Sequence, residues 1–174
     1  KETHGIVLFP GGFGTLDEGF ETLTLIQTGK SPPLPFVLLD KPRGTYWKTW
    51  ETYIEDHLLR RGWISEEDLG LYFVTDRADR AVDEITRFYR VYHSSRYLHD
   101  LMVIRCRREI PAREADHLAK EFRDMLVKDG IERSKALPEE DDPSLAHLPR
   151  LILRFNRRSF GRLRAFIDAL NDLG

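Results

Sequence analysis

The sequence predicts an α/β fold built on a parallel sheet, and three observations support this class. Nearly continuous apolar runs occupy Gly5–Phe9, Phe36–Asp40 and Leu71–Thr75, which is typical of strands covered on both faces. The segments between these runs carry apolar residues at helical spacing. After about residue 92 the order of elements changes, which indicates a second structural unit.

The helices between the predicted strands each present one apolar face. These faces consist of Leu16, Phe20, Leu23 and Ile26 in the first helix, Trp47, Trp50, Ile54 and Leu58 in the second, and Ala81, Ile85, Phe88 and Tyr92 in the third. Gly29 and Gly62 end the first two helices. This βαβαβα series is typical of a doubly wound, Rossmann-like parallel sheet. We therefore expect residues 1–92 to form part of such a sheet, as a nucleotide-binding domain.

Residues 93–174 predict a small α+β C-terminal extension with some antiparallel pairing. The expected order is a strand, a helix, two strands and a helix, at Leu101–Cys106, Ala112–Lys128, Ile131–Leu137, Arg150–Phe155 and Phe160–Leu173. Charge supports this division. Residues 1–85 hold 9 Lys and Arg against 15 Asp and Glu, whereas residues 86–174 hold 18 against 14.

Composition limits the class of protein. With 41% hydrophobic residues among 174, the chain can bury a core. No apolar run approaches the roughly 18–20 residues that span a bilayer, and we expect no membrane partner. The single cysteine, Cys106, cannot form an internal disulfide, so a cytoplasmic location is expected. The six histidines are scattered, and no metal site is expected.

The most informative segment is the loop Pro10–Glu18, which follows the first predicted strand and opens a helix. Such a turn presents free backbone N–H groups and the positive end of a helix dipole, a natural seat for phosphate. Thr15 can cap the helix or bind a phosphate oxygen, and the Glu18 carboxylate lies one turn further. Three glycines allow the backbone to approach a ligand closely: Gly11, Gly12 and Gly14.

A purely structural interpretation of this loop stays open. Thr15 and Glu18 have the spacing of a capping box, in which Glu18 only satisfies the Thr15 N–H group. Two well-known phosphate loops do not fit. The dinucleotide fingerprint requires a third glycine where Asp17 stands, and a P-loop requires a lysine after its last glycine. Hydride transfer and nucleoside triphosphate hydrolysis are therefore disfavoured.

The segment from Pro10 to Glu18, with Glu21 and Thr24–Lys30, closely resembles the PGGxGTxxE signature of the LOG ("Lonely Guy") family. Its members are nucleoside 5′-monophosphate phosphoribohydrolases that release cytokinin bases and are often mislabelled lysine decarboxylases. The resemblance weakens towards residue 92. It implies that Glu18 is the catalytic carboxylate at the ribose and that no metal or organic cofactor takes part. It also implies a 5′-phosphate site formed by Gly11, Gly12, Phe13, Gly14 and Thr15.

The resemblance further implies the reaction and the partners. The substrate would be AMP or a cytokinin-type monophosphate, and the protein a homodimer or higher homo-oligomer. Family members carry further strands and an arginine-bearing helix upstream of the signature. We therefore expect this chain to be the C-terminal portion of a longer member, its first strand pairing with a missing N-terminal segment. A non-catalytic nucleotide-binding module and an interaction domain with a purely structural loop remain alternatives.

Three other features have structural interpretations. A cluster of C-terminal arginines could bind nucleic acid, but nearby acidic residues provide counter-charges that argue against this function. The arginines are Arg150, Arg154, Arg157, Arg158, Arg162 and Arg164. Helical spacing of Trp47, Trp50, Tyr53 and Ile54 favours core or dimer packing over a wall for a base. His93 is interpreted as a surface or linker residue at a helix exit, and Cys106 as a small buried hydrophobe.

Overall fold

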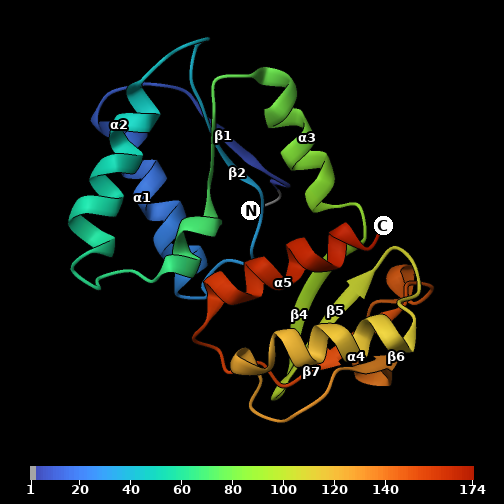
Figure 1. Ribbon diagram of the computed structural model, residues 1–174. Helices are drawn as coiled ribbons and strands as arrows, with labels where there is room; N and C mark the ends of the chain where they lie inside the picture. Colours follow the sequence, from blue (N-terminus) through green and yellow to red (C-terminus); the bar gives the residue numbers. More distant parts are fainter. Residues whose placement is uncertain (1–2) are drawn as a thin grey trace. The chain divides into compact units, whose positions relative to one another are not determined.

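A computed structural model describes residues 3–174 (Figure 1). The chain divides into two units. The first contains residues 1–87 and Phe160–Ala165, and the second contains Phe88–Ser159 and Phe166–Gly174. None of the helices within residues 3–174 is long and apolar enough to cross a membrane.

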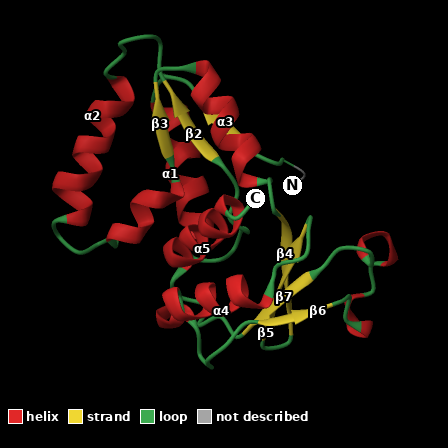
Figure 2. Ribbon diagram, turned by 45° about the vertical axis from the view of Figure 1, so that its right-hand side comes forward, coloured by secondary structure: helices red, strands yellow, loops and turns green. Residues whose placement is uncertain are grey.

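The first unit contains the predicted parallel sheet, which confirms the fold class. Its strands, in the order β1-β2-β3, are β1 (Ile6–Leu8), β2 (Phe36–Leu39) and β3 (Phe73–Thr75). Its three α-helices follow the strands in turn, as α1 (Phe13–Gln27), α2 (Tyr46–Tyr53) and α3 (Ala78–Phe88). In Figures 1 and 2, α1 and α2 lie on one side of the sheet and α3 on the other. This arrangement explains why the strands are continuously apolar.

The core of the first unit lies between β2 and the helices α1 and α2. Phe36 and Leu38 of β2 are almost fully buried, and they pack with Ile26 of α1 and Trp47 of α2. The α2 segment continues as a π-helix at Ile54–Leu59, so the predicted second helix is present but changes its hydrogen bonding. Leu71, the predicted first residue of the third strand, instead ends a 3₁₀ helix at Glu66–Leu71.

The second unit is an antiparallel sheet with two helices, as expected of an α+β extension. The sheet has the order β4-β5-β7-β6, with β4 (Tyr92–Leu98), β5 (Leu101–Cys106), β6 (Glu132–Ser134) and β7 (Arg150–Leu153). The helices are α4 (Ala112–Glu121) and the C-terminal part of α5 (Phe160–Asp172). The predicted helix to Lys128 is wrong beyond Glu121, where a 3₁₀ turn at Arg123–Met125 follows instead.

The structure differs from the prediction around residue 92 in two ways. The third helix ends at Phe88, and Tyr92 begins the unpredicted strand β4. The cause is Asn171 of α5, whose amide is fully buried. Its Oδ1 accepts hydrogen bonds from the N–H groups of Val91 and Tyr92 at 2.8 and 2.9 Å, and its Nδ2 donates to the Phe88 carbonyl at 2.6 Å. These bonds replace the helical ones, and the chain leaves the helix.

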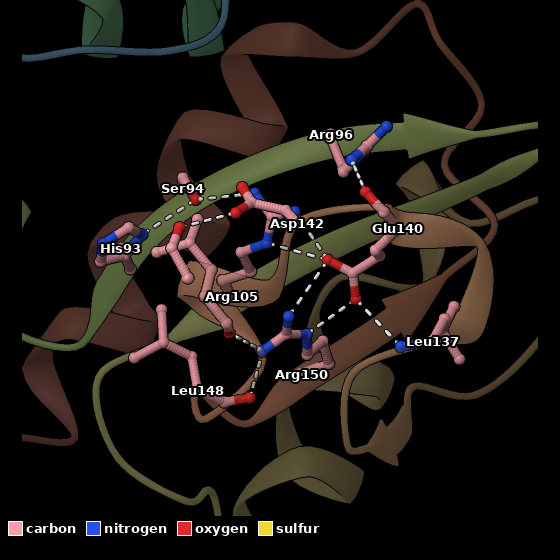
Figure 3. Close-up of polar contacts among 11 residues, drawn as sticks. His93, Ser94, Arg96, Arg105, Leu137, Glu140, Asp142, Leu148 and Arg150 are labelled. Carbon is pink, nitrogen blue, oxygen red and sulfur yellow. Dashed lines mark hydrogen bonds and ion pairs between the residues drawn. The ribbon is translucent and has the colours of Figure 1, made fainter.

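A buried ion network joins the acidic turn of the second unit to its sheet (Figure 3). Glu140 accepts bonds from Arg150 Nε at 2.8 Å and from Arg105 Nη2 at 2.7 Å, and the Leu137 N–H group donates to it at 3.1 Å. The Glu140 side chain is 2% exposed. Burial opposes ionisation, but the bonds from Arg150, Leu137 and Arg105 prevail and lower the pKa of Glu140 to about 2.

The C-terminal arginines do not form one basic face. Arg150 and Arg164 are buried, and they are paired with Glu140 and Glu84 respectively. The Arg157 guanidinium lies over the Tyr97 ring, 4.5 Å from its centroid. A nucleic-acid surface would need these guanidinium groups in solvent, facing the same way.

Candidate functional site

The candidate site lies at the carboxyl ends of the parallel strands in the first unit. A hollow of about 790 Å³ opens there, between the segments that follow β1, β2 and β3. It is lined by Phe9, Pro10, Leu39–Pro42, Thr45, Tyr46, Asp76 and Ala78. This edge is where open α/β sheets usually bind ligands.

The glycine loop enters α1 earlier than the sequence predicted. Gly12 is the N-cap, in an extended conformation, and the helix begins at Phe13. The N–H groups of Thr15 and Leu16 donate to the Gly12 carbonyl at 3.1 and 3.3 Å. Thr15 is therefore inside the first turn, and the capping-box interpretation of Thr15 and Glu18 is wrong.

The three loop glycines have different surroundings. A Cβ atom on Gly11 would lie 2.1 Å from Thr15 Oγ1, so the Thr15 hydroxyl occupies the space that any side chain at Gly11 would need. A Cβ atom on Gly12 or Gly14 would have no described heavy atom within 4 Å, when the chain neighbours and the helix backbone are left out. Neither residue has a positive φ. Packing therefore requires the glycine at Gly11 only.

Asp40 and Tyr46 belong to this edge of the sheet, and the sequence analysis did not identify them. Asp40 is only 7% exposed and directly follows β2, and its N–H group donates to the Thr75 carbonyl at 2.8 Å. Its Oδ1 accepts the Lys41 N–H at 2.8 Å and its Oδ2 the Tyr46 N–H at 2.8 Å. The Tyr46 hydroxyl donates to the Gly11 carbonyl at 2.7 Å. An acid directly after a buried strand was the available signal for Asp40.

Asp76 joins the loops that follow β2 and β3. Its Oδ2 accepts the Arg43 N–H at 2.8 Å, and Arg43 has a φ of 60°. Asp40 and Asp76 therefore both stabilise the wall of the hollow through backbone amides. Both oxygens of Asp40 and one oxygen of Asp76 thus accept backbone hydrogen bonds.

Glu18 lies on the outer side of α1. It is solvent-exposed, three residues after Thr15, and therefore on the same helix face as that residue. The residues of α1 that are buried are Gly19, Thr22 and Ile26. The structure thus brings Gly11–Thr15 and Glu18 together at the start of α1, while Glu18 does not line the hollow.

The aromatic stripe on α2 is partly core. Trp47 and Ile54 are buried, as predicted, and Trp50 is half-buried against Tyr72 with ring centroids 5.2 Å apart. Tyr53 is 51% exposed and does not share this packing.

His93 and Cys106 both belong to the second unit. His93 is a half-buried residue of β4, so its placement in a linker is wrong; its Nδ1 lies 2.9 Å from Ser94 Oγ. Cys106 is fully buried, as predicted, and burial raises the pKa of its thiol to about 12.

Comparison with known protein families gives a match in the first unit. Residues 1–85 match the model of a family described as "Possible lysine decarboxylase". The match covers the parallel sheet and the glycine loop, and it supports membership of this family. No curated protein matches the chain.

The described residues do not fit the cofactor that lysine decarboxylation requires. Pyridoxal phosphate is held as a Schiff base on a lysine, with an acid or arginine at its pyridinium nitrogen. Every lysine among residues 3–174 is solvent-exposed, including Lys41, which lines the hollow. Asp40, the buried acid nearby, already accepts backbone hydrogen bonds. The residues present therefore do not assemble a pyridoxal phosphate site.

Proposed function

We propose that this protein is a cytoplasmic hydrolase that cleaves the N-glycosidic bond of a nucleoside 5′-monophosphate, of the AMP or cytokinin type. The products are the free base and ribose 5-phosphate. The observation that carries the proposal is the open space above Gly12 and Gly14 at the start of α1. These glycines serve no packing or positive-φ requirement within the described residues, which favours close approach of a ligand.

The proposed phosphate site uses the backbone amides of Gly11, Gly12, Phe13 and Gly14. The first N–H groups of a helix have no helical partner, and the helix dipole attracts an anion there. The Thr15 hydroxyl, in the same turn, can donate a further hydrogen bond to a phosphate oxygen. A dianion held here supplies binding energy away from the bond that reacts.

Glu18 supplies the proposed catalytic carboxylate. When the bond between C1′ and the base nitrogen breaks, the electron pair leaves with the base and the ribose acquires oxocarbenium character. A carboxylate stabilises this positive charge and accepts a proton from the water that adds to C1′. The leaving base takes up one proton, so the net change is the addition of one water molecule across the bond.

We also propose that assembly completes the site. Phe9 and Phe13 beside the loop are 62% and 94% exposed, and β1 is an edge of the sheet within residues 3–174. Exposed apolar edges are normally covered. We propose that a further strand, from an N-terminal segment of the same protein, pairs with β1. We further propose that the protein is a homodimer or higher homo-oligomer.

The test is incubation of the protein with AMP and a cytokinin monophosphate, followed by chromatography of the free base. We expect turnover by the wild type and a loss of at least about 100-fold in kcat for Glu18→Gln, because a positioned carboxylate contributes at this scale. Glu21→Gln, an exposed acid on the same helix, is the matched control and should retain activity. Equal activity of Glu18→Gln and wild type would contradict the catalytic role.

A non-catalytic nucleotide-binding module is the second candidate function. It is favoured by one observation, namely that the hollow at the strand ends does not include Glu18. Tight AMP binding in calorimetry without release of base would support this alternative.

A further inference from the structure

We infer that Tyr46 is a positioning residue that orients the glycine loop for phosphate. This inference rests on the proposed function. The Tyr46 hydroxyl donates to the Gly11 carbonyl at 2.7 Å, which joins the start of α2 to the loop after β1. The two residues are 35 positions apart, so the contact exists only in the folded unit.

The orientation of the Gly11 carbonyl determines where the next amide points. The peptide bond between Gly11 and Gly12 is planar and trans, so its C=O and N–H groups point in opposite directions. Because the Gly11 carbonyl points at Tyr46, the Gly12 N–H group points away from Tyr46. That amide is one of the donors in the proposed phosphate site.

Tyr46 is itself held by the buried acid Asp40. Asp40 Oδ2 accepts the Tyr46 N–H at 2.8 Å, and the Asp40 backbone is anchored to β3 through the Thr75 carbonyl at 2.8 Å. The Tyr46 ring lies edge-on against the buried Trp47 ring, with centroids 4.8 Å apart. The tyrosine is thus restrained at its backbone and at its ring, which leaves the hydroxyl in a fixed place.

The loop is also restrained from its other side. Thr15 Oγ1 occupies the position beside Gly11 where a side chain would begin. Gly11 is therefore hydrogen-bonded at its carbonyl by Tyr46, and Thr15 fills the space beside its Cα atom. Without the Tyr46 hydrogen bond, the peptide unit between Gly11 and Gly12 is free to rotate. Glycine on both sides makes this rotation easy.

The experiment compares Tyr46→Phe with Tyr53→Phe. Tyr46→Phe removes only the hydroxyl, and Tyr53→Phe removes a hydroxyl from an exposed ring on the same helix. Affinities for inorganic phosphate, AMP and adenosine are measured by calorimetry, and KM and kcat by release of base from AMP. We expect Tyr46→Phe to bind phosphate and AMP about fivefold more weakly, the usual scale of one hydrogen bond. KM should rise by the same factor, with kcat and adenosine binding unchanged.

A second measurement reports on the loop directly. In protein labelled with ¹⁵N-glycine, phosphate should shift the Gly12 amide resonance of the wild type. It should shift that resonance less in Tyr46→Phe, with the Gly29 resonance as an internal reference. Tyr53→Phe should behave as the wild type in every assay.

The outcomes separate this inference from the proposed function. A wild type that binds neither phosphate nor AMP overturns both. A wild type that binds phosphate without hydrolysing AMP overturns the reaction alone, and the calorimetry then decides the role of Tyr46. Unchanged phosphate affinity in Tyr46→Phe overturns the inference, and so does an equal loss of adenosine binding, which would indicate general disturbance of the site.

Discussion

Replacing Gly14 by alanine separates the stability of the glycine loop from its ability to bind an anion. Gly14 is the second residue of α1, and a Cβ atom there meets nothing described within 4 Å apart from its chain neighbours and the helix itself. Alanine favours a helix over glycine by about 0.5–1 kcal/mol in the helix interior. We therefore expect Gly14→Ala to leave the free energy of unfolding unchanged or to raise it by up to about 1 kcal/mol, a rise in Tm of about 2–4 °C.

The same methyl group occupies the space in which we place the phosphate. A phosphate oxygen hydrogen-bonded to the first amides of α1 would lie against this group. We expect AMP affinity to fall at least about tenfold, or by 1.4 kcal/mol or more. Thermal unfolding and calorimetric titration with AMP measure the two effects on one preparation.

The matched variant is Gly11→Ala. Here the new Cβ atom lies 2.1 Å from Thr15 Oγ1 and 2.9 Å from Thr15 Cβ, so Thr15 must move. Overpacking of this kind costs about 1–3 kcal/mol of stability. If Gly14→Ala is destabilised as much as Gly11→Ala, the described surroundings of Gly14 are wrong. If Gly14→Ala binds AMP as the wild type does, the phosphate does not bind at this loop.

Four further predictions concern buried groups. Glu140→Gln should lower the free energy of unfolding of the second unit by about 3–5 kcal/mol in urea titrations, because two buried guanidinium groups lose their counter-charge, whereas Glu139→Gln should not. The folded-state pKa of Glu140 is about 2, against an ordinary value of 4.5. The stability that ionised Glu140 gives to the folded state is therefore complete above about pH 4.5 and is lost as the pH falls towards 2. Unfolding midpoints that do not change over this pH range would contradict this prediction. The Cys106 thiol, with a pKa of about 12, should react with a thiol reagent at pH 8 only after unfolding, and rapid labelling of the native protein would refute its burial. Gly44→Ala places a Cβ atom 2.0 Å from Asp40 Oδ1 and should weaken AMP binding together with stability, which paired titration and melting experiments would check.

The strands of the parallel sheet could be predicted because each is buried on both faces. The run from Phe36 to Leu38 is almost inaccessible to solvent, and its apolar character is unbroken. The strand β4 could not be found in the same way. Its residues from His93 to Arg96 are polar and half-buried, so they give no apolar periodicity. Its position depends on Asn171, which lies about 80 residues further along the chain.

Only the part of the candidate site that is continuous in sequence could be predicted. The glycines and Thr15 form one continuous motif, and its pattern indicated a strand, a loop and a helix in the order that the structure shows. The predicted start of the helix was wrong by three residues because Gly12, rather than Thr15, supplies the N-cap. The bond from Tyr46 to Gly11 joins two separate βα units, and no spacing rule connects them.

The ion network around Glu140 has a consequence for how the second unit tolerates change. Residues 138–142 look like an acidic spacer between two strands, the kind of segment in which insertions and protease cleavage are usually accepted. Within residues 3–174, Glu140 of this segment is the only acid that contacts the buried guanidinium groups of both Arg105 and Arg150. Cutting or lengthening the segment would therefore leave two buried positive charges without their counter-charge. Its amide hydrogens should exchange with solvent on the timescale of the central strands rather than on that of a surface turn.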